Sequence, residues 1–356
     1  MNTMTKFFFV ALALAGMTTS VLADSECVPN AKSQAEGEEY LKKAEAAEKA
    51  GRIKDAYDAT SKWSPCFYDA SPAEKRFWAL RRRTGLKLGE EAERKGHFVE
   101  AFKYYDEHLY GIAADRVQMK MAVAKPGDFK TVQGVVGYFR STQENLKRDA
   151  PQDIKSMSFD KARDQVPIHL RSKDDAYTLD PDRNARLKAV SGYLGKLQAI
   201  ATKEGEKYLA DEDRIFSKRK TSVMAKSDSL SELKKAKDWL GLFGQEKRAN
   251  DRAVKRGDTL LADDSRKSLE LAISYYGLAG NENKERKVRD KARGLGDAHL
   301  RKGEKKIAAD YYHLAGLDDK ASQLEEANEA EKEKTEAKRQ DKFKKDQKSL
   351  EKELGF

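Results

Sequence analysis

The 356-residue chain carries 70 Lys and Arg residues against 60 Asp and Glu, and charged residues make up 37% of it. Ordinary soluble domains hold roughly 25% charged residues, so this composition argues against one large apolar globule and favours a thin, layered helical protein. Only 7 residues are proline, and the many Ala, Glu and Lys residues favour long helices. The net charge of +10 is compatible with acidic partners and equally with simple solubility.

Residues 1–23 have the pattern of a secretory signal peptide. Lys6 precedes an apolar run at residues 7–17, which is too short to span a bilayer as a helix. Val21 and Ala23 are small residues suited to a cleavage site, so we expect cleavage after Ala23, with an uncleaved anchor as the alternative. No later apolar run is long enough to cross a membrane. We therefore expect a periplasmic protein without a transmembrane segment in the mature chain.

The two cysteines, Cys27 and Cys66, lie near the start of the expected mature chain. In an oxidising compartment they predict a disulfide bond. It would close a loop of about 40 residues, which the chain-entropy model values at roughly 3–4 kcal/mol. Two free thiols are the alternative. The sequence has no C-x-x-C motif and no His–Cys cluster with metal-ligand spacing, so we predict no metal or cofactor.

Residues 24–110 are predicted to hold two helical hairpins. Ser33 and Ser71 each precede a glutamate by three residues, which is the capping-box pattern of a helix start. Gly51 and Gly96 then mark the ends of the first helix of each hairpin. The predicted helices span residues 33–50, 53–63, 71–95 and 98–110.

Residues 111–245 are predicted to form an irregular helical region. Helices are expected at residues 129–148 and 181–224, and residues 149–180 are interpreted as a loop with short helical turns. A third capping box at Ser229 and Glu232 predicts a helix that begins there and ends near Gly244. No stretch shows sustained strand alternation, so the predicted fold class is all-α.

An internal repeat lies in residues 246–320, where hairpins are predicted at 246–280 and 285–316. Residues 272–280 match residues 308–316 at an offset of 36 residues, and a fixed offset in this range is typical of helical repeats. Residues 321–356 form a charged tail that is predicted to be one long helix. From Glu325 on, the tail has 10 acidic and 9 basic residues. A narrow apolar stripe of Phe343, Leu350 and Leu354 lies near its end and could dock on the repeats or on a partner, and plain solvation is the other possibility.

The hairpins resemble tetratricopeptide repeats, in which small residues let two helices approach closely while an aromatic side chain fills the gap to the next repeat. The resemblance rests on Gly89, Gly96, Ala101 and Tyr105 in the second hairpin, on Gly257, Ala272, Tyr276 and Ala279 in the third, and on Gly296, Gly303, Ala308, Tyr312 and Ala315 in the last. In the first hairpin, Thr60 stands where the aromatic residue is expected.

This resemblance implies a helical-hairpin solenoid with a long charged C-terminal helix, and a groove that binds peptides or partner helices. Groove positions carried over from the family fall in the first helix of each hairpin. They are Arg83, Leu86, Glu90 and Glu93 in the second hairpin, and Arg293, Asp297 and Leu300 in the last.

These features favour a non-enzymatic adaptor that binds a protein partner of the cell envelope. The alternative is a binder of anionic envelope polymer or lipid, through the basic runs at residues 81–83 and 218–220. The five histidines are scattered, and no nucleophile, phosphate-binding or dinucleotide motif is present. An enzyme is therefore not expected, and a site assembled from residues 111–256 is the third possibility. Export argues against a nucleic-acid partner.

Overall fold

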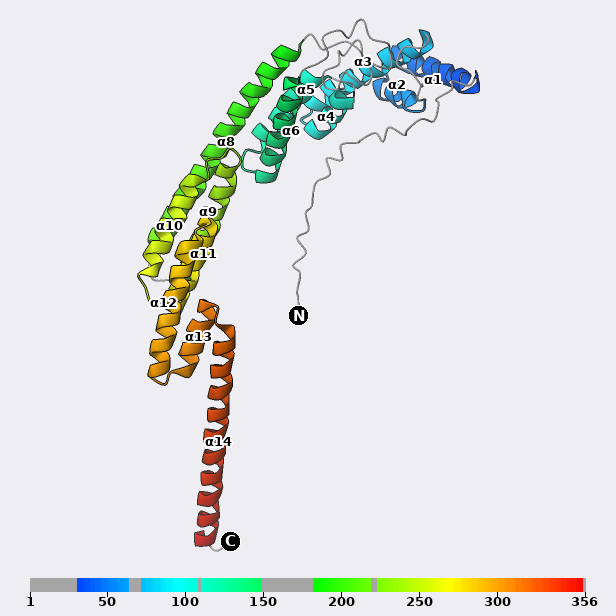
Figure 1. Ribbon diagram of the computed structural model, residues 1–356. Helices are drawn as coiled ribbons and strands as arrows, with labels where there is room; N and C mark the ends of the chain where they lie inside the picture. The colour runs from blue at the N-terminus through cyan, green and yellow to red at the C-terminus, as the bar shows by residue number, and fades with distance from the viewer. Residues whose placement is uncertain (1–30, 64–71, 108–109, 149–181, 219–222, 355–356) are drawn as a thin grey trace. The chain divides into compact units, whose positions relative to one another are not determined.

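The computed structural model describes residues 31–63, 72–107, 110–148, 182–218 and 223–354. The described residues form helices and turns without any strand, which confirms the all-α prediction (Figure 1). The predicted signal peptide, Cys27, Cys66 and the predicted loop at 149–180 lie outside the described residues, as does most of the basic run at 218–220. None of the described helices is long and apolar enough to be a membrane-spanning segment.

Contacts between residues divide the chain into two units. The first unit comprises residues 1–123 and 139–191, and the second comprises residues 124–138 and 192–356. The helices, in chain order, are α1 (Ala31–Lys49), α2 (Ile53–Thr60), α3 (Pro72–Arg94), α4 (Phe98–Glu107), α5 (Gly111–Ala124), α6 (Phe129–Lys147), α8 (Arg183–Lys218), α9 (Val223–Gly241), α10 (Lys247–Leu261), α11 (Arg266–Ala279), α12 (Glu282–Arg301), α13 (Lys305–Ala315) and α14 (Asp318–Leu354).

In the first unit, α1 and α2 form one hairpin and α3 and α4 form the next. Leu41 on α1 packs against Phe77 and Leu80 on α3, and all three side chains are at most 2% exposed. A second apolar cluster joins α3, α4 and α5 around the fully buried Tyr105. Each hairpin therefore buries its apolar face against the helix that follows it.

A buried ion pair also holds the first unit together. The Arg186 guanidinium on α8 donates hydrogen bonds of 2.7 and 3.0 Å to the two oxygens of Asp115 on α5. The two side chains are 10% and 1% exposed. A pair of this kind is costly to break, because either partner would be left as an uncompensated buried charge.

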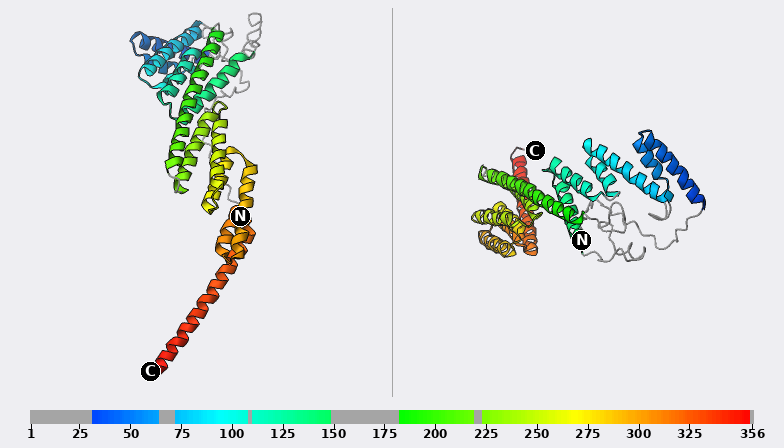
Figure 2. Two further views of the ribbon diagram at one scale, coloured as in Figure 1. Left: turned by 90° about the vertical axis from the view of Figure 1, so that its left-hand side faces the viewer. Right: turned by 90° about the horizontal axis from the view of Figure 1, so that it is seen from above.

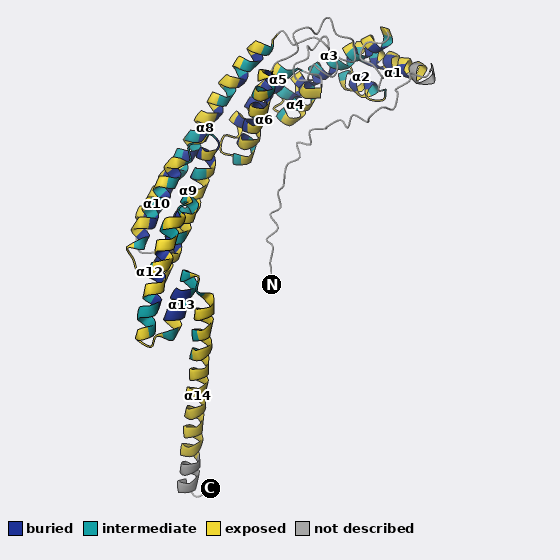
Figure 3. Cartoon of the chain, in the orientation of Figure 1, coloured by how far each residue is buried: buried dark blue, intermediate teal, exposed yellow. Residues whose placement is uncertain are grey.

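The second unit contains the hairpins α10–α11 and α12–α13, with α9 packed on α10 and α11. Its core includes Leu233 and Leu240 on α9, Tyr275 and Tyr276 on α11, and Val288 on α12. Figure 3 shows buried stretches on these helices in dark blue. The second helix of each hairpin ends in a left-handed glycine, at φ 67° for Gly280 and φ 77° for Gly316. A side chain at either position would strain the backbone, so glycine ends these helices sharply.

A buried polar network lies beside this core. Glu212 on α8 is completely buried and accepts hydrogen bonds of 2.8 and 3.0 Å from Arg256 on α10. It accepts a third, of 2.7 Å, from the hydroxyl of Ser229 on α9, which in turn accepts one of 3.0 Å from Tyr275 on α11. The network ties four helices together at one point, and every group in it has a partner.

The prediction of a helix start at Ser229 was wrong. Ser229 lies inside α9, which begins at Val223. The capping-box pattern was misleading because the Ser229 hydroxyl is needed by Glu212, a tertiary partner that lies far away in the sequence. Smaller differences occur elsewhere: α1 begins two residues before Ser33, α2 already ends at Thr60, and α5 is a helix where none was predicted.

The charged tail is helical, as predicted, and it divides into two parts. The first turns of α14 pack on α13, where Ala321 is fully buried and Leu317 and Leu324 are partly buried around Tyr312. Residues 325–347 are exposed, apart from Asn328, which is part-exposed. Figure 2 shows α14 continuing beyond α13 as a single helix. The start of the helix is thus docked, whereas Phe343 of the apolar stripe is 71% exposed.

Candidate functional site

The predicted partner-binding residues lie next to a structural unit that recurs three times, which we call the tyrosine seat. In each seat, a tyrosine on the second helix of a hairpin covers a glycine on the first helix. Its hydroxyl donates to a carboxylate on the first helix, and a cation on the following helix binds that carboxylate. The seats consist of Gly89, Tyr105, Glu93 and Arg116; Gly257, Tyr276, Asp258 and Lys284; and Gly296, Tyr312, Asp297 and Lys320.

The seat of the last hairpin shows how these groups depend on one another. A Cβ atom on Gly296 would lie 2.9 Å from a ring carbon of the fully buried Tyr312, so only glycine fits. The Tyr312 hydroxyl donates a 2.6 Å hydrogen bond to Asp297, and the Lys320 ammonium lies 3.1 Å from the same oxygen. The Tyr312 hydroxyl and then Lys320 lower the pKa of Asp297. Lys320 also lies 4.1 Å from the centre of the tyrosine ring.

The seat in α3, α4 and α5 is the most strongly charged. Glu93 accepts hydrogen bonds from Arg116 at 2.7 and 2.9 Å, from Lys120 at 2.8 Å and from the Tyr105 hydroxyl at 2.8 Å. These donors, Arg116 foremost, lower the pKa of Glu93 to about 2. Glu93 therefore stays ionised and links three successive helices.

Two of the predicted groove residues, Glu93 and Asp297, are thus occupied inside the seats. Arg83 forms hydrogen bonds of 2.7 and 2.6 Å with Glu48 on α1. Leu86 and Leu300 are partly buried against their hairpins, whereas Glu90 and Arg293 are exposed. The first four predicted residues belong to the first unit and the other three to the second. The surface that the resemblance assigns to a partner is therefore largely engaged within the chain.

The basic run at residues 81–83 is engaged in the same way. The Arg81 side chain is 15% exposed and pairs with Glu107. Its guanidinium also lies 5.0 Å from the centre of the Tyr57 ring. Since Arg83 is held by Glu48, two of the three arginines already have carboxylate partners. This pairing weakens the run as a binding site for an anionic polymer.

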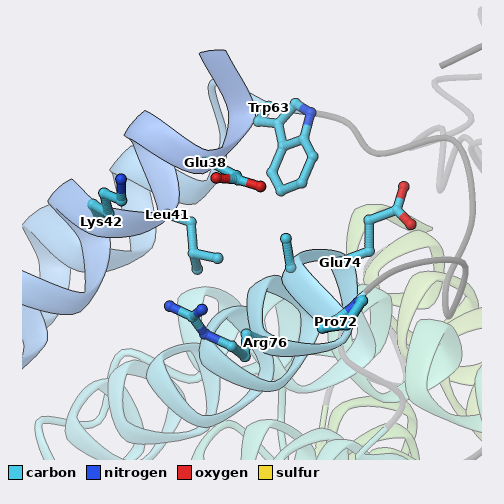
Figure 4. A pocket seen from close by; sticks show the side chains of 8 residues that line it. Glu38, Leu41, Lys42, Trp63, Pro72, Glu74 and Arg76 are labelled. Atoms are coloured by element: carbon cyan, nitrogen blue, oxygen red, sulfur yellow. The ribbon is translucent and has the colours of Figure 1, made fainter. Parts of the chain in front are cut away.

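A first hollow lies between α1 and α3, with a volume of about 290 Å³. Figure 4 shows Glu38, Leu41 and Lys42 from α1 facing Pro72, Glu74 and Arg76 from α3, with Trp63 at one side. Arg76 pairs with Glu45 at 2.7 Å. Trp63 and Pro72 border the undescribed residues 64–71. The polar groups around the hollow do not converge on a common point as a catalytic set would.

A second and larger hollow, of about 690 Å³, lies between α2 and α4, and we call it the α2–α4 hollow. Tyr57 and Tyr104 form its aromatic wall, with their ring centres 5.3 Å apart in an edge-to-face arrangement. Val99 is 60% exposed, although it is apolar. The remaining lining residues are Gly96, His97, Phe98, Glu100, Lys103 and Glu107. Aromatic walls with an exposed apolar residue and a charged rim are typical of a protein-binding surface.

Sequence reasoning missed the α2–α4 hollow because the resemblance directed attention to the first helix of each hairpin, whereas α2 and α4 are second helices. The doubled tyrosine at 104 and 105 was a usable signal. Tyr105 fills the seat, which leaves its neighbour Tyr104 to point elsewhere.

Within the described ranges, no three His, Cys, Asp or Glu side chains are close enough together to hold a metal ion. Comparison with protein-family models, with curated proteins and with solved structures found no match to this chain.

Proposed function

We propose that this protein is a non-enzymatic, tetratricopeptide-like adaptor of the cell envelope, which binds a protein partner through the α2–α4 hollow. The hollow supports this proposal most directly, because Val99 is 60% exposed beside two tyrosines. A partner that covers Val99 would remove this apolar surface from water, which favours binding. The recurring tyrosine seats support the repeat interpretation, since in each a tyrosine covers a glycine and its hydroxyl donates to a carboxylate on the same helix as that glycine. The signal-peptide pattern of residues 1–23 supports export.

A matched pair of variants tests the adaptor proposal. Val99→Asp places a charge in the α2–α4 hollow, whereas Ile307→Asp does the same at an exposed apolar position on α13. We expect that the wild-type protein and Ile307→Asp capture the same protein from an envelope extract, while Val99→Asp loses it. Burial of one apolar side chain contributes about 1.5–3 kcal/mol, so the affinity should fall by at least about tenfold.

The salt dependence of the captured material separates this proposal from the anionic-polymer alternative. A partner bound through apolar contacts should remain bound at high salt, whereas polymer or lipid held by basic residues should elute. Equal capture by Val99→Asp and wild type would refute the role of the hollow. Elution of polymer or lipid alone, with no protein retained, would favour the alternative.

A further inference from the structure

The exposed part of α14 has a charge distribution that its overall balance conceals. Residues 325–336 contain six acidic and two basic residues, whereas residues 337–348 contain six basic and two acidic residues. A nearly neutral helix is thus an acidic segment followed by a basic one.

The basic residues include a regular row. Lys334, Lys338, Lys342 and Lys345 follow one another at steps of four, four and three residues, which keeps them on one side of a helix. All four side chains are exposed. At a rise of about 1.5 Å per residue, the row spans roughly 17 Å, with about 6 Å between neighbours. We call these four residues the lysine row.

The lysine row continues the side of α14 that faces α13. Lys305, at the start of α13, binds Glu331 at 2.6 Å, so the turn between α12 and α13 lies beside this part of α14. Lys334 follows Glu331 by three residues, on the same face. Lys302 and Lys306, on either side of Lys305, are exposed as well. The row thus begins beside another basic segment and extends beyond the end of the hairpin.

These lysines differ from several arginines of the hairpins. Arg83, Arg116 and Arg256 all have carboxylate partners on neighbouring helices. Among the described residues, no member of the lysine row forms a salt bridge, although the charge of Lys334 contributes, after Lys305, to the lowered pKa of Glu331. Lysines four residues apart repel one another. Asp341 and Asp346 lie three or four residues from members of the row and offset part of this repulsion, and an anion bound along the row would offset the rest.

We propose that the lysine row is a binding surface for a linear polyanion. Evenly spaced ammonium groups on one face fit a flexible chain of negative charges, and the released counterions favour binding. A lipid surface fits less well. Phe343, 71% exposed, is the exposed large apolar residue of the described part of α14. At about 100° per residue, the four lysines lie roughly 100–180° around the helix from it. A membrane-bound helix needs its apolar and basic residues on the same side.

The test measures binding of fluorescent inorganic polyphosphate to the full-length mature protein as salt rises. In the test variant, Lys334, Lys338, Lys342 and Lys345 are replaced by Gln. In the control variant, Lys42, Lys49, Lys62 and Lys75, which are exposed and lie outside α14, are replaced by Gln. Both changes remove four positive charges, so long-range attraction is matched. Gln and Lys have similar helix propensity, so circular dichroism should show equal helix content without ligand.

We expect the test variant to bind polyphosphate at least about tenfold more weakly than wild type, and its salt slope to be smaller by about three. The control variant should keep most of the affinity and the slope. Polyphosphate should raise the helix content of wild type and of the control variant, but not that of the test variant. Equal losses in both variants, or no binding by wild type, would overturn the proposal. So would tighter binding to phosphatidylglycerol vesicles that Phe343→Ser abolishes. None of these outcomes depends on Val99, so the adaptor proposal is tested separately.

Discussion

In each tyrosine seat, the tyrosine ring lies so close to the glycine that a larger residue does not fit at the glycine position. Replacing an interior glycine by alanine normally stabilises a helix by up to about 1 kcal/mol. At Gly89 and Gly257 a Cβ atom would lie 2.6 Å from the tyrosine ring, and at Gly296 it would lie 2.9 Å away. These contacts reverse the usual effect, because the ring is buried and cannot move aside.

Two glycines on α12 allow a direct test. Gly296→Ala should lower the free energy of unfolding by about 1–3 kcal/mol through overpacking against Tyr312. Gly294→Ala, two residues earlier, meets nothing within 4 Å and should raise it by about 0.5–1 kcal/mol. Urea unfolding followed by circular dichroism measures both. Stabilisation by both substitutions would contradict the close packing of the seat.

Glu93 should make the stability of the first unit depend on pH. Its pKa is lowered from 4.5 to about 2 in the folded protein. Its contribution is therefore complete above pH 4.5 and disappears as the pH falls to about 2. The free energy of unfolding of Glu93→Gln should lie below that of wild type by about 1–3 kcal/mol near neutral pH. This difference should shrink as the pH falls.

Glu90→Gln serves as the control for Glu93→Gln, because Glu90 is exposed on the same helix. It should change the free energy of unfolding by no more than about 0.5 kcal/mol. Denaturant unfolding at several pH values gives all three curves. A difference between Glu93→Gln and wild type that does not vary with pH would show that ionisation of Glu93 is not what stabilises the seat.

At the scale of the element, α14 begins where a further repeat would begin. Lys320 occupies the position in the last seat that Lys284 of α12 occupies in the preceding one. The first turns of α14 therefore complete the seat of α12 and α13, and they cover the cluster around Ala308 and Tyr312. The rest of the helix makes few contacts with the hairpins and is free to serve another purpose.

Truncation should separate these two parts of α14. A chain that ends after Glu331 keeps Lys320, Ala321, Leu324 and the ion pair to Lys305, so α13 should remain as protected as in the full chain. A chain that ends after Leu317 exposes Tyr312 and should lose roughly 2 kcal/mol of local stability. Hydrogen exchange of α13 measures both. Equal protection in the two truncations would contradict the docked role of the first turns.

For the whole molecule, two units imply that unfolding need not be a single transition. Each unit has its own buried charge. Arg186 and Asp115 form an ion pair in the first, and Glu212 and Arg256 form one in the second. Loss of one partner should weaken the unit that contains it, because the penalty arises from the charge left behind.

Arg186→Met tests this independence. It should lower the stability of the first unit by about 3–5 kcal/mol, since Asp115 remains buried without its main partner. Arg214→Met removes a 62% exposed arginine from a pair with Asp211 and should cost less than about 1 kcal/mol. Hydrogen exchange, compared between α3 and α11, reports on each unit. Equal loss of protection in both helices after Arg186→Met would show that the units unfold together.

Much of the helix arrangement was predictable from local patterns. The ends of α3, α11 and α13 follow from proline and glycine signals, because these residues act on the backbone within one or two positions. The offset of 36 residues between residues 272–280 and 308–316 likewise predicts two similar hairpins. The long helical tail follows from its composition alone.

Only the tertiary structure decided which charged and polar side chains are engaged within the chain and which are exposed for binding. The neighbouring sequence does not distinguish Glu93, which is held by three donors, from the exposed Glu90. It also does not distinguish Arg83, which is held by Glu48, from the exposed Lys338. Likewise, the pattern at Ser229 looks like a helix start until Glu212 approaches it. Backbone preferences act over a few residues and can be predicted from sequence, whereas the partner of a charged side chain depends on helices that meet only after folding.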